Sequence, residues 1–202
     1  MTNMKRFADI IFSFIAILVL LPFFLLIALL IVLDSKGGIF YKQARVGKNM
    51  NTFLLFKFRT MKIDSDKQGL LTVGQDKRIT RAGKWLRKYK IDELPQFFNV
   101  LMGNMSMVGP RPEVLKYVKL YNEEQQKVLT VKPGITDYAS LMYFEESKQL
   151  AESQNPEEFY INTIMPHKLE LSLQYLQKQS FLFDTGILLK TFFRILGFYK
   201  RN

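Results

Sequence analysis

The sequence contains no cysteine and only one histidine, and each shortage excludes a class of chemistry. Without cysteine the chain has no disulfides, no thiolate metal ligands and no cysteine nucleophile, which fits a reducing compartment. A Ser-His-Asp triad would depend on His167 alone, and a metal site built from several histidines is excluded. The glycine-rich signatures that bind dinucleotides and nucleoside triphosphates are also absent. Phosphate chemistry in this chain would therefore have to use carboxylates and basic side chains.

Acidic residues are scarce relative to basic ones. The 29 lysines and arginines against 18 aspartates and glutamates give a formal charge of +11, which favours polyanionic partners such as nucleic acid, anionic lipid or phosphorylated substrates. A long apolar N-terminal segment selects among these, because a nucleic-acid-binding protein has no need of one, whereas a protein on an anionic membrane surface gains from it. We therefore expect membrane lipid as a partner and no nucleic acid.

Residues 7–33 are almost wholly apolar, and Asp9 is their only ionisable residue. At about 1.5 Å per residue, a helix of this length exceeds the ~30 Å hydrocarbon core of a bilayer, and the run is too long for a signal peptide. Pro22, near its middle, predicts a kink or a break. Either a kinked helix crosses the bilayer, or a re-entrant helix turns at Pro22 and leaves on the side that it entered. Basic residues on both flanks, Lys5 and Lys36, favour the re-entrant form.

The rest of the chain predicts a mixture of short strands and helices, so the expected fold class is α+β. Strand-forming stretches around a turn predict a small hairpin, and helical spacing predicts several amphipathic helices. The last apolar stretch predicts either a helix in the membrane interface or an ordinary packed helix. The expected elements are strands 39–46 and 52–61, a polar loop 64–76, a cationic helix 79–89, helices 113–129 and 156–179 with a break at Pro166, and a helix within 181–199.

Two adjacent acids, Asp92 and Glu93, directly follow the cationic helix and precede Pro95. A carboxylate near concentrated positive charge stays ionised, can bind a divalent metal through oxygen and can attack phosphorus as a nucleophile. Adjacency alone is a weak signal, because three other acidic pairs lie in expected helices, where the ordinary interpretation is a solvated face. These pairs are at 123–124, 145–146 and 157–158.

Four ordered motifs carry a resemblance to a known family. They are Phe56-Lys57-Phe58-Arg59-Thr60-Met61; Asp92-Glu93-Leu94-Pro95-Gln96 with Phe98-Asn99-Val100-Leu101; Met105-Ser106-Met107-Val108-Gly109-Pro110-Arg111-Pro112; and Lys132-Pro133-Gly134-Ile135-Thr136. With these motifs the chain closely resembles the bacterial sugar transferase family, the monotopic phosphoglycosyl transferases. The resemblance covers nearly the whole chain.

The resemblance implies a membrane enzyme at the cytoplasmic face of the bacterial inner membrane. Residues 1–36 would form a re-entrant helix-break-helix, and residues 37–202 a cytoplasmic catalytic domain. Family members transfer a sugar-1-phosphate from a UDP-sugar to undecaprenyl phosphate and release UMP, through a covalent phosphosugar-aspartate intermediate. This is the first membrane step of bacterial glycoconjugate assembly. Neither the sugar nor the oligomeric state follows from the resemblance.

Carried onto the matching residues, the resemblance assigns Asp92 as the nucleophile and Glu93 as a metal ligand or base. Both would bind Mg²⁺, the implied cofactor. Arg111 would hold phosphate within its proline-framed turn. Three further basic residues are weaker candidates for contacts with the donor, and for each a surface ion pair is the alternative: Lys57, Arg59 and Arg87.

Two rival interpretations stay open. Asp64 and Asp66 form an Asp-x-Asp motif, which would suit a metal-dependent glycosyltransferase that releases UDP instead of UMP. The chain could also be a membrane scaffold without catalytic activity that uses its basic surface on lipid head groups. In a scaffold the substitution Asp92→Asn would be silent.

Overall fold

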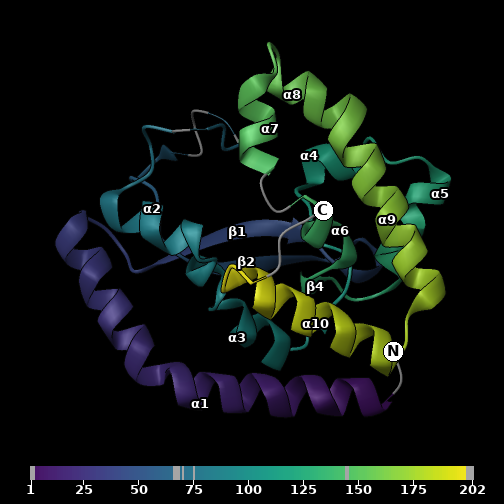
Figure 1. Ribbon diagram of the computed structural model, residues 1–202, viewed down its shortest axis with the longest axis horizontal. Helices are drawn as coiled ribbons and strands as arrows, with labels where there is room; N and C mark the ends of the chain where they lie inside the picture. Colours follow the sequence, from purple (N-terminus) through teal and green to yellow (C-terminus); the bar gives the residue numbers. More distant parts are fainter. Residues whose placement is uncertain (1–2, 66–68, 70, 75, 144–145, 199–202) are drawn as a thin grey trace.

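The base of the molecule is a single long helix, α1 (Asn3–Asp34), which includes Pro22. The computed structural model describes residues 3–65, 69, 71–74, 76–143 and 146–198. Figure 1 shows α1 bent into two limbs, the first running beneath the other elements and the second rising along the left side to the level of α2. Of the kink or break predicted at Pro22, the structure shows a kink within a continuous helix. A proline removes one backbone hydrogen bond, whereas ending the helix inside an apolar run would leave several backbone groups unpaired.

Polar side chains attach α1 to the rest of the protein at both ends. Near its start, the Lys5 ammonium contacts the Asp184 carboxylate at 2.5 Å, and Asp9 is buried. At its other end, Asp34 accepts a hydrogen bond of 2.9 Å from the backbone N–H of Ala82. Both ends of the helix are thus bound to one protein body.

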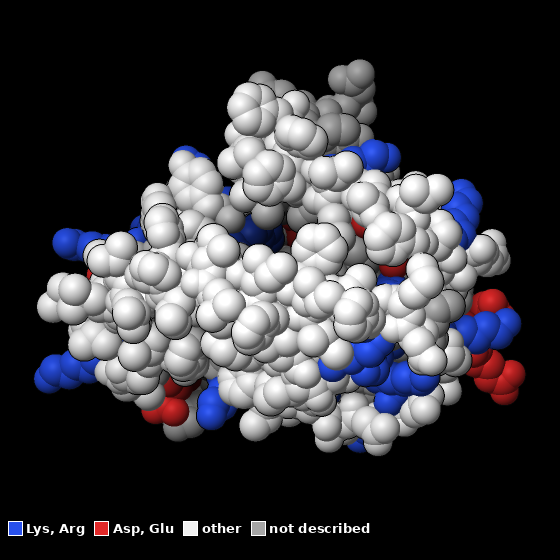
Figure 2. All heavy atoms as spheres, turned by 90° about the horizontal axis from the view of Figure 1, so that it is seen from below, with Lys and Arg blue, Asp and Glu red and all other residues white. Residues whose placement is uncertain are grey.

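The side of α1 that faces away from the rest of the protein is apolar and exposed. Its most apolar 18-residue window has a mean hydropathy of 3.4 and is only 17% buried, so the helix is long and apolar enough to cross a membrane. Val19 and Leu25, for example, are 71% and 66% exposed. Figure 2 shows that the face seen from below is largely free of charged side chains, which lie mostly toward its edges.

Two small sheets lie above this helix. Strands β1 (Phe40–Val46) and β2 (Thr52–Phe58) pair antiparallel across the short 3-10 turn η1 (Lys48–Met50), so the predicted hairpin is confirmed. A second pair, β3 (Ser106–Val108) with β4 (Gly134–Thr136), is parallel and was not predicted. Each of its strands has only three residues, too few to show strand periodicity in the sequence.

The cationic helix is present as α2 (Arg81–Lys88), and Thr80 caps its first turn by accepting a hydrogen bond from the N–H of Gly83. The turn η3 (Ile91–Glu93) and α3 (Gln96–Leu101) follow it.

The single helix expected over 113–129 is wrong. The chain forms α4 (Leu115–Val118), α5 (Glu123–Gln126) and the 3-10 turn η4 (Lys127–Thr130) instead. Asn122 is extended and forms a reciprocal capping box with Gln125, which starts a new helix where the prediction had continued the old one.

The C-terminal third is helical. After α6 (Tyr138–Met142) and α7 (Glu146–Glu152), Asn155 caps α8 (Pro156–Phe159) as predicted. The expected irregularity near Pro166 is a π-helical turn, η5 (Tyr160–Ile164), and Pro166 lies in the first turn of α9 (Met165–Lys178). Helix α10 (Phe181–Ile195) lies over α1 in Figure 1 and contacts α6, β3 and β4. The fold class is α+β, as expected.

Candidate active site

Asp92 and Glu93 lie together in η3, between the cationic helix α2 and α3. The turn starts at Lys90, whose φ of 56° is left-handed and redirects the chain after α2. Both acids line one large cleft, and they are joined there by Lys57, Arg87 and Arg111. The structure therefore brings together five of the six polar residues that the sequence indicated.

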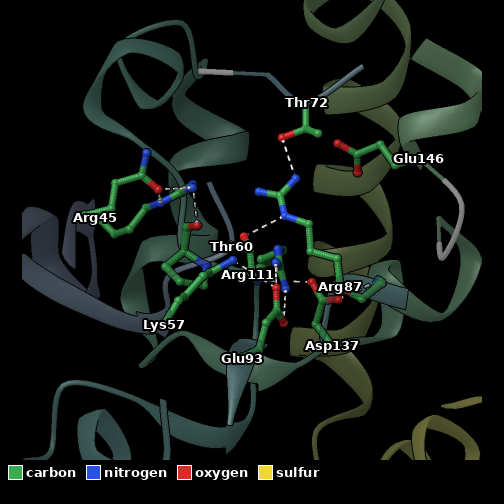
Figure 3. Close-up of polar contacts among 12 residues, drawn as sticks. Arg45, Lys57, Thr60, Thr72, Arg87, Glu93, Arg111, Asp137 and Glu146 are labelled. Atoms are coloured by element: carbon green, nitrogen blue, oxygen red, sulfur yellow. Dashed lines mark hydrogen bonds and ion pairs between the residues drawn. The ribbon is translucent and has the colours of Figure 1, made fainter. Parts of the chain in front are cut away.

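Glu93 is held from two sides. Lys57, on β2, contacts Glu93 Oε1 at 3.0 Å, and Arg111 Nη2 contacts the same oxygen at 2.5 Å. A second Arg111 nitrogen, Nη1, lies 3.3 Å from Oε2, so the guanidinium binds the carboxylate through two nitrogens (Figure 3). Burial alone would raise the pKa of Glu93, but Arg111 and then Lys57 hold it well below its usual range. Glu93 is thus a fixed anion.

Arg111 is positioned by the turn that follows β3. Its backbone N–H donates to Asp137 Oδ2 at 3.0 Å, and Asp137 also caps α6. At the base of this turn the backbones of Gly109 and Gly134 pack so closely that a β-carbon on Gly134 would lie 2.1 Å from Gly109 N. Asp137 was not predicted as part of the site. Its only sequence signal is an acid placed before a short helix, which is ordinary capping.

Asp92 has a different environment from its neighbour. It is only 5% exposed, it lines the cleft, and no described residue donates a hydrogen bond to its side chain. Burial raises the pKa of Asp92 and Glu93 raises it further, while Lys57 and Arg87 oppose the shift. The carboxylate is therefore poorly solvated, surrounded by cations and available for reaction.

Arg87 and Arg59 have different positions. Arg87 lines the cleft, where its Nε donates to Thr60 at 2.9 Å and its Nη1 to Thr72 at 3.0 Å (Figure 3). Arg59 does not line it. Its side chain instead donates to the backbone carbonyls of Ser35, at 2.8 Å, and Lys36. It thus binds carbonyl groups just beyond the C-terminus of α1, where a cation is favoured. The structure therefore does not support the expectation that Arg59 contacts the donor.

The cleft has a volume of about 1030 Å³, enough for a substrate larger than most small-molecule ligands. Basic residues outnumber acidic ones in its lining, and part of the lining is apolar. The basic residues are Arg45, Lys57, Lys84, Arg87, Lys88, Lys90, Arg111, Lys148 and Lys168; the acids are Asp76, Asp92, Glu93, Glu113 and Glu146. Such a site suits a ligand that carries several negative charges and also an apolar part.

A second carboxylate network lines the cleft and was missed at the sequence level. Glu113 follows the Pro110-Arg111-Pro112 turn directly and binds Arg45 at 2.7 Å and the Tyr160 hydroxyl at 2.5 Å. Burial opposes ionisation of Glu113, but Arg45 and Lys168 keep its pKa below its ordinary value. Nothing local in the sequence joins Glu113 to residues so distant along the chain.

A divalent metal could be held here only together with a ligand. No group of three or more acidic or histidine side chains is placed to hold a metal ion among the described residues. Asp92 nevertheless fits Mg²⁺, because it offers carboxylate oxygens without a hydrogen-bond donor, and Mg²⁺ in phosphate-processing sites is held by one or two carboxylates plus substrate phosphates. Glu93 already binds two cations. When bound, the metal would supply positive charge for the phosphates.

The rival Asp-x-Asp motif lies elsewhere. Asp64 does not line this cleft, and Asp66 falls outside the described residues. The described part of the motif therefore adds nothing to the site.

Comparison with known proteins gives matches over most of the chain. The family model described as Bacterial sugar transferase matches residues 1–197. A UDP-glucose:undecaprenyl-phosphate glucose-1-phosphate transferase of Xanthomonas campestris pv. campestris is 37% identical over 96% of this chain and 39% of its own length. The protein of the same name from Escherichia coli (strain K12) is 33% identical over 98% of this chain and 41% of its own length. The exopolysaccharide production protein PSS of Rhizobium leguminosarum bv. phaseoli is 45% identical over 68% of this chain and 73% of its own length. The chain thus spans about two fifths of the first two relatives.

Proposed function

Since this chain belongs to the bacterial sugar transferase family, we propose that it transfers a sugar-1-phosphate from a UDP-sugar to undecaprenyl phosphate and releases UMP. The names of the relatives support the two substrate classes. The observation that carries the proposal is the contrast at η3, where a buried Asp92 without a hydrogen-bond donor lies beside a Glu93 that is fully engaged. That contrast suits a nucleophile next to a structural anion.

The transfer divides into two displacements at one phosphorus atom. In the first, an Asp92 oxygen forms a bond to the sugar-linked phosphorus, and the bond from that phosphorus to the bridging oxygen breaks, so that UMP leaves with the electron pair. In the second, a phosphate oxygen of undecaprenyl phosphate attacks the same phosphorus and the Asp92 carboxylate is released. A carboxylate attacks without losing a proton, so the chain needs no histidine base.

The chain's own residues hold charge around this reaction. Arg87 lines the cleft and is close enough to Asp92 to lower the pKa of that carboxyl. The Arg87 guanidinium is held by hydrogen bonds to Thr60 and Thr72. Arg111 keeps Glu93 in place and is 33% exposed, so part of its guanidinium is accessible to a donor phosphate. Mg²⁺ bound at Asp92 would add charge on the phosphates.

We further propose that α1 is re-entrant and that the protein lies on the cytoplasmic face of the bacterial inner membrane. The attachment of Lys5 to Asp184 and of Asp34 to Ala82 puts both ends of α1 on one protein body. A helix attached in this way can insert its apolar side into one leaflet and return. Basic residues on both flanks are the cytoplasmic pattern.

The test is an assay of detergent-purified protein with Mg²⁺, undecaprenyl phosphate and a panel of UDP-sugars, in which UMP and UDP are measured separately. We expect UMP, a phosphosugar adduct on the peptide that contains Asp92, and a loss of about a thousandfold or more in Asp92→Asn. The variant should fold with a thermal midpoint at least equal to that of wild type, because asparagine avoids burying a charge. Release of UDP, or an unchanged rate in Asp92→Asn, would refute the proposal.

A further inference from the structure

The cleft beside Asp92 has an apolar wall that the transfer of the phosphosugar does not by itself require. Leu94 and Phe97 follow Asp92 along η3 and α3 and line the cleft, so apolar surface begins close to the acid. Leu188, Phe192 and Ile195 of α10 extend this surface. A nucleotide and a sugar are polar and gain little from such a wall.

The cleft also reaches exposed apolar surface, because Phe192 of α10 lines the cleft and is largely exposed. Figure 2 shows a hollow in the apolar lower face, and acidic and basic side chains are visible inside it. Exposed apolar side chains lie along α1 and at the end of α10, where Phe192, Phe193 and the following Leu196 are 57%, 46% and 52% exposed. Exposed apolar surface at the end of α10 is therefore continuous, through Phe192, with the apolar wall of the cleft.

Helix α10 is fixed against the strand that borders the site. The Thr191 hydroxyl lies 2.8 Å from that of Thr136 on β4, and at the start of the helix Asp184 binds Lys5. Since Thr136 and Thr191 both line the cleft, this contact places the C-terminal half of α10 at its edge. The apolar wall is thus built into the fold.

We propose, resting on the function proposed above, that this half of α10 and the start of α3 form a groove for the first isoprene units of the lipid acceptor. The groove holds the chain while its phosphate reaches the phosphosugar on Asp92. Phe192 and Ile195 are specificity-determining residues for the length of the acceptor chain. Because lipid tails are as apolar as the groove, the acceptor gains little binding energy by entering it. The groove instead orients the acceptor and discriminates between acceptors of different chain length.

Adjacent residues on α10 provide a matched test. Phe192→Ser and Ile195→Ser change the groove, whereas Phe193→Ser and Leu196→Ser change neighbouring exposed side chains that do not line the cleft. Each variant is assayed for two steps: UMP release without acceptor in a single turnover, and transfer to undecaprenyl phosphate or to a phosphate carrying one or two isoprene units.

We expect the groove variants to raise the KM for undecaprenyl phosphate by about tenfold, with UMP release unchanged and a smaller effect on the short acceptor. Phe192→Leu should retain the wild-type KM, and the two control variants should stay within about twofold. An equal rise in the KM for undecaprenyl phosphate in the groove and control variants would show that α10 acts only as a membrane anchor. Loss of UMP release in the groove variants would assign α10 to the support of the catalytic residues. Either result overturns the groove, whereas wild-type protein that releases no UMP refutes the proposed function itself.

Discussion

At the scale of single residues, neighbouring acids have opposite environments in the same turn. Glu93 accepts contacts from Lys57 and Arg111, while Asp92 has no hydrogen-bond donor among the described residues. Burial penalises the ionised form of both, but only Glu93 is compensated by direct ion pairs. The chain thus fixes one carboxylate by ion pairs and leaves the other without a direct partner, which is the difference that the proposed nucleophilic role of Asp92 needs.

The first prediction concerns pH. A protonated Asp92 cannot attack phosphorus, and its pKa is raised by burial. The rate of UMP release should therefore fall on acidification at a pH above the ordinary range of aspartate, while the low pKa of Glu93 keeps that residue ionised throughout. Lys57→Met removes a charge that lowers the pKa of Asp92, so it should move the acid limb to higher pH. The measurement is the pH profile of single-turnover UMP release, and an acid limb that Lys57→Met leaves in place would contradict this account.

The second prediction concerns stability. Glu93→Gln removes the carboxylate that both Lys57 and Arg111 contact, and Lys57 is largely buried, so the substitution should lower the free energy of unfolding by about 3 kcal/mol. The folded pKa of Glu93 is depressed, so its contribution is present above its unfolded pKa and is lost as the pH falls through its folded pKa. Thermal unfolding of wild type and variant at neutral and acidic pH measures both effects.

A matched control for Glu93 is Glu157, whose ion pair with Lys116 is exposed, with 48% and 55% of the two side chains accessible. Glu157→Gln should change stability by no more than about 0.5 kcal/mol. If both glutamine variants lower the free energy of unfolding equally, the buried network around Glu93 contributes no more to stability than the exposed ion pair of Glu157.

The partners of the basic side chains are the part of the site that could not be predicted from the sequence. The family resemblance assigned phosphate to Arg111 and made Lys57 and Arg59 weaker candidates for donor contacts, with a surface ion pair as the alternative. The partner that each side chain binds depends on the three-dimensional fold. Arg59 directly follows the end of β2, and its side chain reaches carbonyls beyond the end of α1, while Lys57 inside β2 reaches Glu93. No local pattern could separate them, because both partners depend on how β2 packs against distant segments.

At the scale of elements, the parallel pair of β3 and β4 positions the arginine turn. Gly109 and Gly134 allow the two backbones to approach within the space that a side chain would fill. The prolines indicate a turn around Arg111, but β3 and β4 are too short to give a periodic signal in the sequence. The single helix predicted over 113–129 is instead α4, α5 and η4, because Asn122 caps a new helix there. The longer hairpin and α2 had clear periodicity and were predicted correctly.

The third prediction tests the close approach of the Gly109 and Gly134 backbones. Gly134→Ala would place a β-carbon 2.1 Å from Gly109 N, a backbone atom that cannot move alone. The variant should lose about 1–3 kcal/mol of stability and should reduce UMP release, because Arg111 follows Gly109 by two residues. Calorimetry and the single-turnover assay measure the two losses.

Gly186, in the interior of α10, is the contrasting position. A β-carbon there meets no atom within 4 Å, and alanine favours a helix over glycine by about 1 kcal/mol. Gly186→Ala should therefore keep or raise stability with unchanged UMP release. A Gly134→Ala variant with the same behaviour would show that the close crossing is not needed to hold Arg111.

At the scale of the whole molecule, the protein combines an apolar base with a charged cleft, which is the combination that the proposed transfer from a water-soluble donor to a lipid acceptor needs. Figure 2 shows a hollow in the apolar lower face with charged side chains inside it, and Phe192 of α10 is both exposed and part of the cleft lining. Composition predicted a membrane partner and a polyanionic ligand separately. How the apolar helices are placed relative to the cleft could not be predicted, because this depends on the contacts of Lys5, Asp34 and Thr191 that bind α1 and α10 to the same body.

The last prediction concerns the path of α1, and the absence of cysteine makes it direct to test. Asn3→Cys and Lys36→Cys introduce single thiols at exposed positions near the two ends of the helix. If both ends return to the body on one side of the membrane, a membrane-impermeant maleimide should label both in inverted vesicles and neither in intact spheroplasts. Gln126→Cys, an exposed position on α5, reports the side of the body, and Val19→Cys, 71% exposed on the apolar side of α1, should resist a charged reagent in both preparations. Labelling of residue 3 and residue 36 from opposite sides would instead make α1 a bent spanning helix, and the contacts of Lys5 and Asp34 with one body could not then both persist in the membrane.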